Sequence, residues 1–288
     1  MVDLAIYYKT YLESLKKSPH TIKQYCNDTR QFLNYMKEHQ YTFEDPISKI
    51  IESYNEFLTD SYSSAASINR KKASLHHFLQ FLKQRNRINE IPQNLLKPSR
   101  LENKPIQTLS NKQVEKVSRY WIEEYQSSSD NEYKWFALRN FCLVNLMLEI
   151  GVKPSEIAGL KWSHIKETEI TIIQNNKIRK LLLSDTLLKW LDLFHCETEE
   201  LLPSSKEGEF VWLGLGNKQN EAISVKTIER IFQSLSNNLG FKVTATVVRY
   251  TRIEADVKKT HDEHLYNLYI QYGYARKSVL KDRIQRFN

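Results

Sequence analysis

The stretch LRNFCLVNLMLEIGVKPSEIAGLKWSHI, residues 138–165, decides the fold of the second half of the chain. Its first part is apolar nearly all round, which predicts a helix buried on every side. Gly151 ends this helix, and Pro154 begins another short one. The alternating run that starts at residue 169, a polar tip and the run KLLL predict a β-hairpin over 169–183. A buried helix, a glycine turn and a hairpin therefore form the centre of one domain.

Helical patterns continue on both sides of this centre. Ser110 is a good N-cap for the helix NKQVEKVSRYWIEEY. Further helices are expected over 185–194, over 224–239 and from 244 to the end. We therefore assign residues 108–288 to a C-terminal domain.

The first part of the chain has its own helical pattern. Apolar residues from Leu4 to Leu15 recur at helical spacing, and Ser18 with Pro19 predicts the start of the next helix. A weaker helix is expected over 50–60, and another after Ser67. We therefore assign residues 1–90 to an N-terminal helical domain. Residues 91–107 hold three prolines and no clear period, which is typical of a linker.

Composition excludes several functional classes. Lys plus Arg is 42 and Asp plus Glu is 34, a net charge of +8 that would steer a polyanion to the surface. Seven glycines argue against a glycine-rich nucleotide loop. Three distant cysteines and eight histidines without metal spacing predict neither disulfides nor a metal site. No apolar run is long enough to span a membrane, so we expect a cytoplasmic protein.

Six segments in order resemble the tyrosine recombinase (phage integrase, Xer-like) family. They are SPHTIKQYCNDTRQFLNYM, SINRKKASLHHFLQFLKQRNRINEIPQNLLKPSRL, LRNFCLVNLMLEIGVKPSEIAGLKWSHI, the hairpin at 169–183, VVRYT and YGYARKSVLKDRI. The resemblance implies a mainly α fold with a small β-hairpin or sheet in the C-terminal domain. It also implies a two-domain, C-shaped clamp around DNA, with an N-terminal core-binding domain and no cofactor.

The resemblance also implies a reaction, phosphoryl transfer by covalent catalysis. In the family a tyrosine attacks the scissile phosphate, two arginines clamp its oxygens and a lysine protonates the leaving hydroxyl. A lysine does not supply the planar fork of an arginine. The site residues of this chain can therefore be compared with that pattern one by one.

Arg249 is the clear survivor of the family's catalytic set. The positions that depart from the pattern are Lys153 for the first arginine, Gln174 for the lysine (a small shift would bring in Lys177), Thr246 and Tyr274 for histidines, and Arg283 for the nucleophile. Without the nucleophile no covalent intermediate forms, so we predict no catalytic residues and a protein that is not an enzyme.

Basic residues at several places, with one threonine and one asparagine, are candidates for DNA contact. They are Lys16, Lys17, Thr21, Lys23, Asn69, Arg70, Lys71, Lys153, Lys177, Arg179 and Arg249. Arginine and asparagine at the start of a helix can read guanine and adenine edges, whereas a solvated helix face is the alternative. Arg249 could instead be an ion-paired core residue, and Lys153 could simply be solvated.

The leading hypothesis is a non-catalytic, sequence-specific regulator that binds double-stranded DNA, most naturally a repressor of a phage or mobile element. The alternatives are an active recombinase with a displaced nucleophile, taken from Tyr266, Tyr269, Tyr272 or Tyr274, and an inactive partner of a true recombinase. The basic tail after Arg276 would either dock on a second copy, giving a homo-oligomer, or fold back on its own domain.

Overall fold

The structure is a computed structural model that describes residues 2–100, 104–174, 177–202, 209–214, 221–260 and 265–287. The chain divides into two compact units, Met1–Asn103 (unit 1) and Lys104–Asn288 (unit 2), and each is described by itself. The expected hairpin tip, Asn175 and Asn176, lies outside the described residues.

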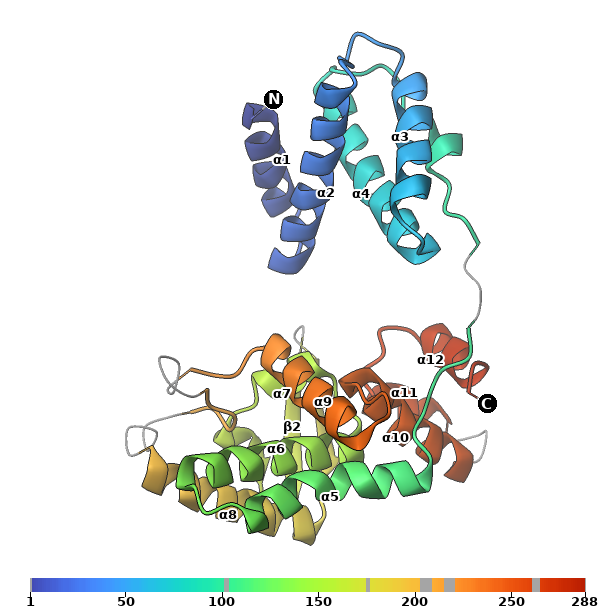
Figure 1. The fold of residues 1–288 in the computed structure, drawn as a ribbon. Helices are drawn as coiled ribbons and strands as arrows, with labels where there is room; N and C mark the ends of the chain where they lie inside the picture. The colour runs from blue at the N-terminus through green and yellow to red at the C-terminus, as the bar shows by residue number, and fades with distance from the viewer. Residues whose placement is uncertain are drawn as a thin grey trace. The chain divides into compact units, whose positions relative to one another are not determined.

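Unit 1 is a helical bundle, as the sequence predicts (Figure 1). Its elements are α1 (Val2–Ser14), α2 (Pro19–Glu38), α3 (Ile47–Ser61), α4 (Ala65–Gln84) and the 3₁₀ helix η1 (Gln93–Leu96). Ser18 begins α2 because its Oγ accepts the backbone N–H of Thr21 at 3.1 Å. The long α2 and α4 pack against each other, and their apolar faces meet in a core that includes Phe32 and Phe78.

Unit 2 is also mainly helical. Its elements are α5 (Asn111–Ser127), α6 (Asn131–Ile150), α7 (Pro154–Ala158), η2 (Trp162–His164), β1 (Ile165–Lys166), β2 (Glu169–Gln174), β3 (Lys177–Leu182), α8 (Asp185–Leu201), α9 (Val225–Leu239), α10 (Ala245–Lys259), α11 (Leu265–Gln271) and α12 (Lys277–Ile284). The mainly α fold with a small sheet is confirmed.

Helix α6 is the centre of unit 2. It packs against α5, α8 and α10 (Figure 1), and its apolar positions are buried on all sides, as its sequence predicts. Gly151 ends α6 with a φ of 58°, a left-handed conformation that favours glycine. The turn that follows places Lys153 at the start of α7.

The sheet is antiparallel with the order β1-β2-β3. Gln174 pairs with Lys177 and Glu169 with Leu182, so β2 and β3 form the expected hairpin. The two-residue strand β1 pairs with β2 as a third strand. Side chains alternate along a strand, so Lys177 and Arg179 of β3 share one face. The register of the hairpin therefore decides which basic residues reach the glycine turn.

The C-terminal segment is helical, as expected from 244 to the end. It forms three helices, α10, α11 and α12, and Gly273 turns the chain between the last two with a φ of 58°. The tail folds back on its own unit, since the backbone N–H of Ile106 donates to the Arg286 carbonyl at 2.8 Å. No helix within the described ranges is long and apolar enough to cross a membrane.

Candidate functional site

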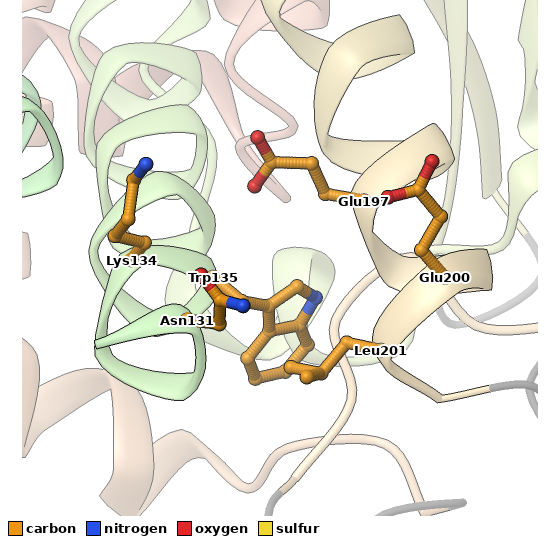
Figure 2. Close-up of a pocket in the computed structure, with 6 residues that line it drawn as sticks. All are labelled: Asn131, Lys134, Trp135, Glu197, Glu200 and Leu201. Atoms are coloured by element: carbon orange, nitrogen blue, oxygen red, sulfur yellow. The ribbon is translucent and has the colours of Figure 1, made fainter. Parts of the chain in front are cut away.

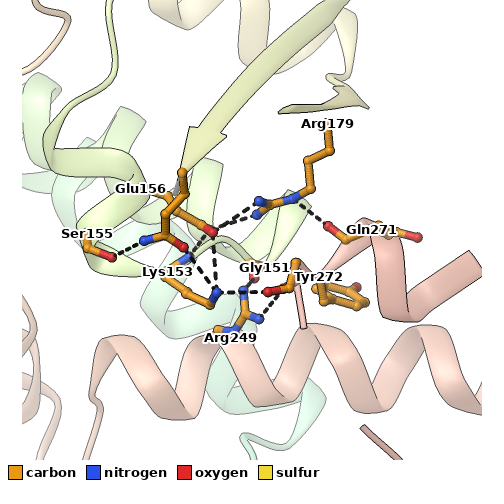
Figure 3. Close-up of polar contacts among 10 residues, drawn as sticks. Gly151, Lys153, Ser155, Glu156, Arg179, Arg249, Gln271 and Tyr272 are labelled. Carbon is orange, nitrogen blue, oxygen red and sulfur yellow. Dashed lines mark hydrogen bonds and ion pairs between the residues drawn. The ribbon is translucent and has the colours of Figure 1, made fainter. Parts of the chain in front are cut away.

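Four charged side chains from three elements of unit 2 point toward one another near the glycine turn (Figure 3). Lys153 comes from the start of α7, Glu156 from α7, Arg179 from β3 and Arg249 from α10. We call these four residues the cation cluster. Three cations thus face a single carboxylate, which leaves an excess of positive charge.

Glu156 is the centre of the cation cluster. Its side chain is fully buried and accepts two hydrogen bonds from the Arg179 guanidinium, at 3.1 and 2.8 Å. It also accepts the backbone N–H of Lys153 at 2.8 Å, and the Lys153 Nζ lies 3.6 Å from the carboxylate. Burial alone would raise the pKa of Glu156, but the bonds from Arg179 and Lys153 bring it below its ordinary value. Glu156 is therefore a carboxylate that fixes two cations.

Arg249 is buried and bound to the backbone on both sides of the site. Its Nη1 donates to the Gly151 carbonyl, and its Nη2 donates to the Tyr272 carbonyl at 2.6 Å. Burial lowers the pKa of Arg249 below its usual value. A guanidinium remains charged even when it is buried in this way. The sequence left two alternatives for Arg249, a phosphate contact or an ion pair in the core, and both gave it a charged partner. In the structure its hydrogen-bond acceptors are two neutral carbonyls.

Lys153 reaches into the same region. Its Nζ donates to the Gly273 carbonyl at 3.0 Å and to the Gln174 Oε1 at 3.2 Å. Burial, together with the nearby charges of Arg249 and Arg179, lowers the pKa of Lys153. Gln174 in turn donates to the Ser155 hydroxyl at 2.8 Å. Lys153 is thus a positioned cation and not a merely solvated one.

Arg179 packs closely against the turn at Gly273. Its Nε donates to the Gln271 carbonyl at 2.8 Å. A Cβ atom at Gly273 would lie 2.8 Å from the Arg179 Nη1, so a side chain there would displace the guanidinium. Glycine at this position therefore makes room for the cation cluster.

Tyr274 borders the cation cluster. Its ring faces the Arg249 guanidinium, whose carbon lies 5.5 Å from the ring centre. The buried Tyr274 hydroxyl makes no hydrogen bond of good geometry. Burial raises the pKa of Tyr274, while the charges of Arg249 and, more weakly, Arg283 oppose that rise. Arg283, which the sequence resemblance assigned to the nucleophile position, therefore lies within electrostatic reach of a tyrosine.

A pocket of about 260 Å³ adjoins Tyr274. Lys177, Arg179 and Gly273 also line it. Lys177 is exposed there, and Thr246 is exposed on α10. The structure therefore brings Lys153, Gln174, Lys177, Arg179, Arg249 and Tyr274 together in one region.

The neighbouring tyrosines have other partners. The Tyr272 hydroxyl donates to Asp256 at 2.5 Å, and the Tyr269 hydroxyl donates to the Ala275 carbonyl at 3.3 Å. The side chain of Tyr266 lies outside the described residues. The rings of Tyr272 and Tyr274 both lie beside the Arg249 guanidinium, at 5.6 and 5.5 Å from its carbon, but only the Tyr272 hydroxyl is bound to a carboxylate.

The first group of residues proposed for DNA contact in unit 1 lies between α1 and α2. Lys16 and Lys17 stand in the turn, where Lys16 has a φ of 52°, and Lys23 is exposed on α2. Thr21 is used in the cap of α2, with its hydroxyl 2.8 Å from that of Ser18. The lysines of this group therefore face solvent at the start of a helix.

The second group lies on α4, and two of its three side chains are bound to other residues of unit 1 and are not free for DNA. Asn69 donates to the Ser99 carbonyl at 2.7 Å and accepts the Ser99 backbone N–H at 2.9 Å. Lys71 is buried and donates to Asp28 at 3.1 Å. Arg70 also binds Asp28, but 41% of its side chain is exposed. Sequence reasoning missed Asp28 and Glu156, and it gave Gly273 no contact with Arg179.

A separate pocket of about 360 Å³ lies between α6 and α8 (Figure 2). Lys134, Trp135, Glu197 and Glu200 line it, and Glu197 accepts a hydrogen bond from the Tyr125 hydroxyl. No residue proposed from the sequence lies there. Across the described parts of the chain, no three His, Cys, Asp or Glu residues gather as metal ligands.

Two family models match the sequence. The phage integrase N-terminal SAM-like domain matches residues 6–86, and the phage integrase family matches residues 107–255. The fold and the cation cluster define a DNA-binding scaffold of the recombinase class. The chain belongs to the phage integrase family of tyrosine recombinases.

Relatives and solved structures agree with this assignment. A protein of Caldanaerobacter subterraneus subsp. tengcongensis that carries a tyrosine recombinase name is 32% identical over 155 residues, which are 52% of this chain and half of that protein. Tyrosine recombinase XerC of the same organism is 25% identical over 269 residues, 84% of this chain and 71% of that protein. A lambda integrase tetramer bound to a Holliday junction matches with a TM-score of 0.71 at 16% identity, covering 99% of this chain and 76% of that one.

The prediction that the chain is not an enzyme is wrong. The matched family is the phage integrase family, and the relatives are named tyrosine recombinases, which are enzymes. The prediction depended on a register that places Arg283 at the nucleophile position. The family match ends at residue 255, before that segment, and the structure places Tyr274 beside Arg249.

Proposed function

We propose that this chain binds duplex DNA at specific sites and cleaves and rejoins a strand there, in the cytoplasm. One observation carries the proposal, namely the gathering of Lys153, Arg179 and Arg249 around a single buried carboxylate. A phosphodiester supplies the negative charge that this excess of cations attracts. The pocket lined by Tyr274, Lys177 and Arg179 gives the phosphate a place beside the tyrosine, whose hydroxyl is buried in the structure and would turn toward the phosphate.

In this proposal Tyr274 is the displaced nucleophile. Its phenol oxygen bonds to phosphorus as the bond from phosphorus to the leaving strand oxygen breaks. The phenol proton passes to water, and the leaving oxygen takes up a proton from a lysine, for which Lys177 lines the same pocket. The reverse reaction rejoins the strand and frees the tyrosine. The Tyr274 ring lies beside Arg249 and its hydroxyl makes no hydrogen bond of good geometry, which supports this assignment over Tyr269 and Tyr272, whose hydroxyls bind other groups.

A nicked duplex tests the proposal directly. Duplexes selected by the protein from genomic DNA are nicked opposite successive phosphates, so that a cleaved strand diffuses away and the adduct accumulates. We expect a slower-migrating protein–DNA band on a denaturing gel, its loss in Tyr274→Phe, and its retention in Tyr269→Phe. A band that persists in Tyr274→Phe would assign the nucleophile elsewhere, and no band at any nick would overturn the cleavage proposal.

A second role uses the same DNA binding, the repression of genes of a phage or mobile element. The observation that favours it is the state of Arg249, which is buried and held by two backbone carbonyls, so it must become exposed before it clamps a phosphate. Binding would then precede cleavage and could by itself block a promoter. Genome-wide binding of the tagged protein tests this role, since peaks at promoters support it and a single peak at a recombination site contradicts it.

Assembly on DNA is also part of the proposal. The lambda integrase structures with a similar fold are a dimer on a core site and a tetramer on a Holliday junction. The C-terminal tail would supply the contact by moving its pairing with Ile106 from its own chain to a second copy. Light scattering with and without duplex DNA tests this, and a monomer under both conditions contradicts it.

A further inference from the structure

Helix α4 carries an arginine that is held by a buried carboxylate and still faces solvent. The Arg70 Nη1 donates to Asp28 of α2, whose side chain is 5% exposed. The Arg70 side chain itself is 41% exposed. A guanidinium has five N–H donors, so one bond to Asp28 leaves most of them available. Asp28 therefore fixes the orientation of the guanidinium and leaves most of its N–H donors available.

The neighbouring polar residues of α4, Asn69 and Lys71, make their hydrogen bonds within unit 1. Lys71 donates to Asp28 at 3.1 Å and to Gln31 at 2.5 Å, and its Nζ lies 4.7 Å from the centre of the Tyr62 ring. Asn69 binds both backbone groups of Ser99. Of the three α4 residues proposed to read bases, Arg70 alone presents a charged group to solvent in this part of the described chain.

The charge of α4 fits a polyanion. The sequence AASINRKKASLHHFLQFLKQ holds four basic residues and no aspartate or glutamate. Lys71 also offsets the charge of Asp28 internally, so the carboxylate does not repel a phosphate backbone through the exposed arginine. A basic helix with one rigidly held guanidinium has the features that reading a base edge requires, since a fork must be fixed in direction to tell one base from another.

We propose that Arg70, held in place by Asp28, reads a guanine in the DNA site by bidentate donation to its O6 and N7 atoms. This rests on the proposed function, because it presumes that the protein binds duplex DNA at specific sites. Arg70 is the residue that determines specificity, and Asp28 is a positioning residue that acts through it. The alternative is that the Arg70–Asp28 ion pair only joins α2 to α4. In that case its loss would lower stability and leave the base preference unchanged.

The experiment selects bound duplexes from a random library with the full-length protein and sequences them. We expect a motif with a guanine preference at one position, and a loss of roughly ten-fold or more of that preference in Arg70→Lys, because lysine keeps the charge and lacks the fork. Lys72→Gln is the matched control on the same helix, and we expect weaker binding with an unchanged motif.

Asp28→Asn tests the positioning role. We expect the guanine preference to relax at the same position and at no other, with unit 1 still folded by circular dichroism. If Asp28→Asn does not fold, Arg70→Lys, which leaves the Lys71–Asp28 contact intact, decides the question.

The outcomes separate this inference from the proposed function. A motif that survives unchanged in Arg70→Lys overturns the inference and leaves the proposed function standing. A wild-type protein that selects no motif overturns site-specific binding, and the inference falls with it.

Discussion

Each unit holds one buried carboxylate that binds two cations, and the two arrangements differ in where the cations point. In unit 1, Asp28 binds a buried lysine, Lys71, and a half-exposed arginine, Arg70. In unit 2, Glu156 binds Arg179 and Lys153, whose side chains are only 10% and 34% exposed. The first arrangement directs one guanidinium outward, whereas the second gathers charge at one point together with Arg249.

This difference indicates two kinds of contact with DNA. An outward, fixed guanidinium suits the edge of a base, which is read by direction. Converging cations suit a phosphate, which carries charge and no sequence information. If both proposals hold, the same local arrangement, a carboxylate that fixes basic side chains, serves base recognition in unit 1 and phosphate binding in unit 2.

Removal of the two carboxylates should produce the largest change. We expect Glu156→Gln to destabilise unit 2 by about 3–5 kcal/mol, because it leaves buried cations without a partner. Asp28→Asn should cost unit 1 about 1–3 kcal/mol, because Arg70 can move its guanidinium into solvent and the buried Lys71 keeps its hydrogen bond to Gln31. Urea denaturation measures both.

Tryptophan fluorescence separates the units in that measurement. All five tryptophans of the chain belong to unit 2, namely Trp121, Trp135, Trp162, Trp190 and Trp212. Glu156→Gln should therefore shift the fluorescence transition, and Asp28→Asn should shift only the circular dichroism. Equal costs for the two variants would contradict the distinction between the buried and the outward cation.

The glycine turn of unit 2 should be nearly as sensitive. Gly151 has a φ of 58°, and a Cβ atom there would lie 2.7 Å from the Tyr272 ring. We expect Gly151→Ala to cost about 3 kcal/mol in strain and overpacking. Gly240→Ala is the matched control, since Gly240 has a φ of 73° and open space, and it should cost about 1 kcal/mol. Similar costs would show that the contact with Tyr272 does not support the site.

Acid should weaken the cation cluster in a defined direction. The pKa of Glu156 is lowered from 4.5 in the folded protein, so its contribution to stability is fully present above pH 4.5 and is lost as the pH falls through the folded value. Each unit of lowering corresponds to about 1.4 kcal/mol. The stability gap between wild type and Glu156→Gln should therefore be constant near neutrality and shrink in acid. A gap that does not change with pH would contradict the ion pairing.

The smallest expected effect concerns Lys177 at the pocket. If it contacts one phosphate, Lys177→Gln should reduce the slope of log affinity against log salt by about one. Lys180→Gln is the control, because Lys180 is exposed on the opposite face of β3 and pairs with Glu169 at 2.8 Å. Equal slopes for the two variants would remove Lys177 from the contact surface.

Local signals in the sequence predicted much of the fold. Ser18, Ser110 and Gly151 mark helix ends through their own chemistry, and the alternating run marks the hairpin. The family resemblance led us to expect Lys153 and Arg249 in the same site. Helical structure was expected from 244 to the end, but the bounds of the three helices there were not predicted, although Gly273 is a visible break.

The carboxylates were missed because their partners are distant in sequence. Glu156 meets Arg179 across 23 residues, and Asp28 meets Arg70 across 42. One signal was available for Asp28, which falls on the apolar face of α2 between Tyr25 and Phe32, where a charge needs a partner. The position of Tyr274 beside Arg249 depends on the turn at Gly273, which sequence spacing alone does not give.

The most direct test of phosphate binding and transfer in unit 2 is to map the covalent bond. The full-length protein is incubated with a nicked duplex from its selected sites, digested with protease and nuclease, and its peptides are weighed by mass spectrometry. We predict a nucleotide attached to the peptide that contains Tyr274. A nucleotide on a different residue, or none on any peptide, would contradict the account.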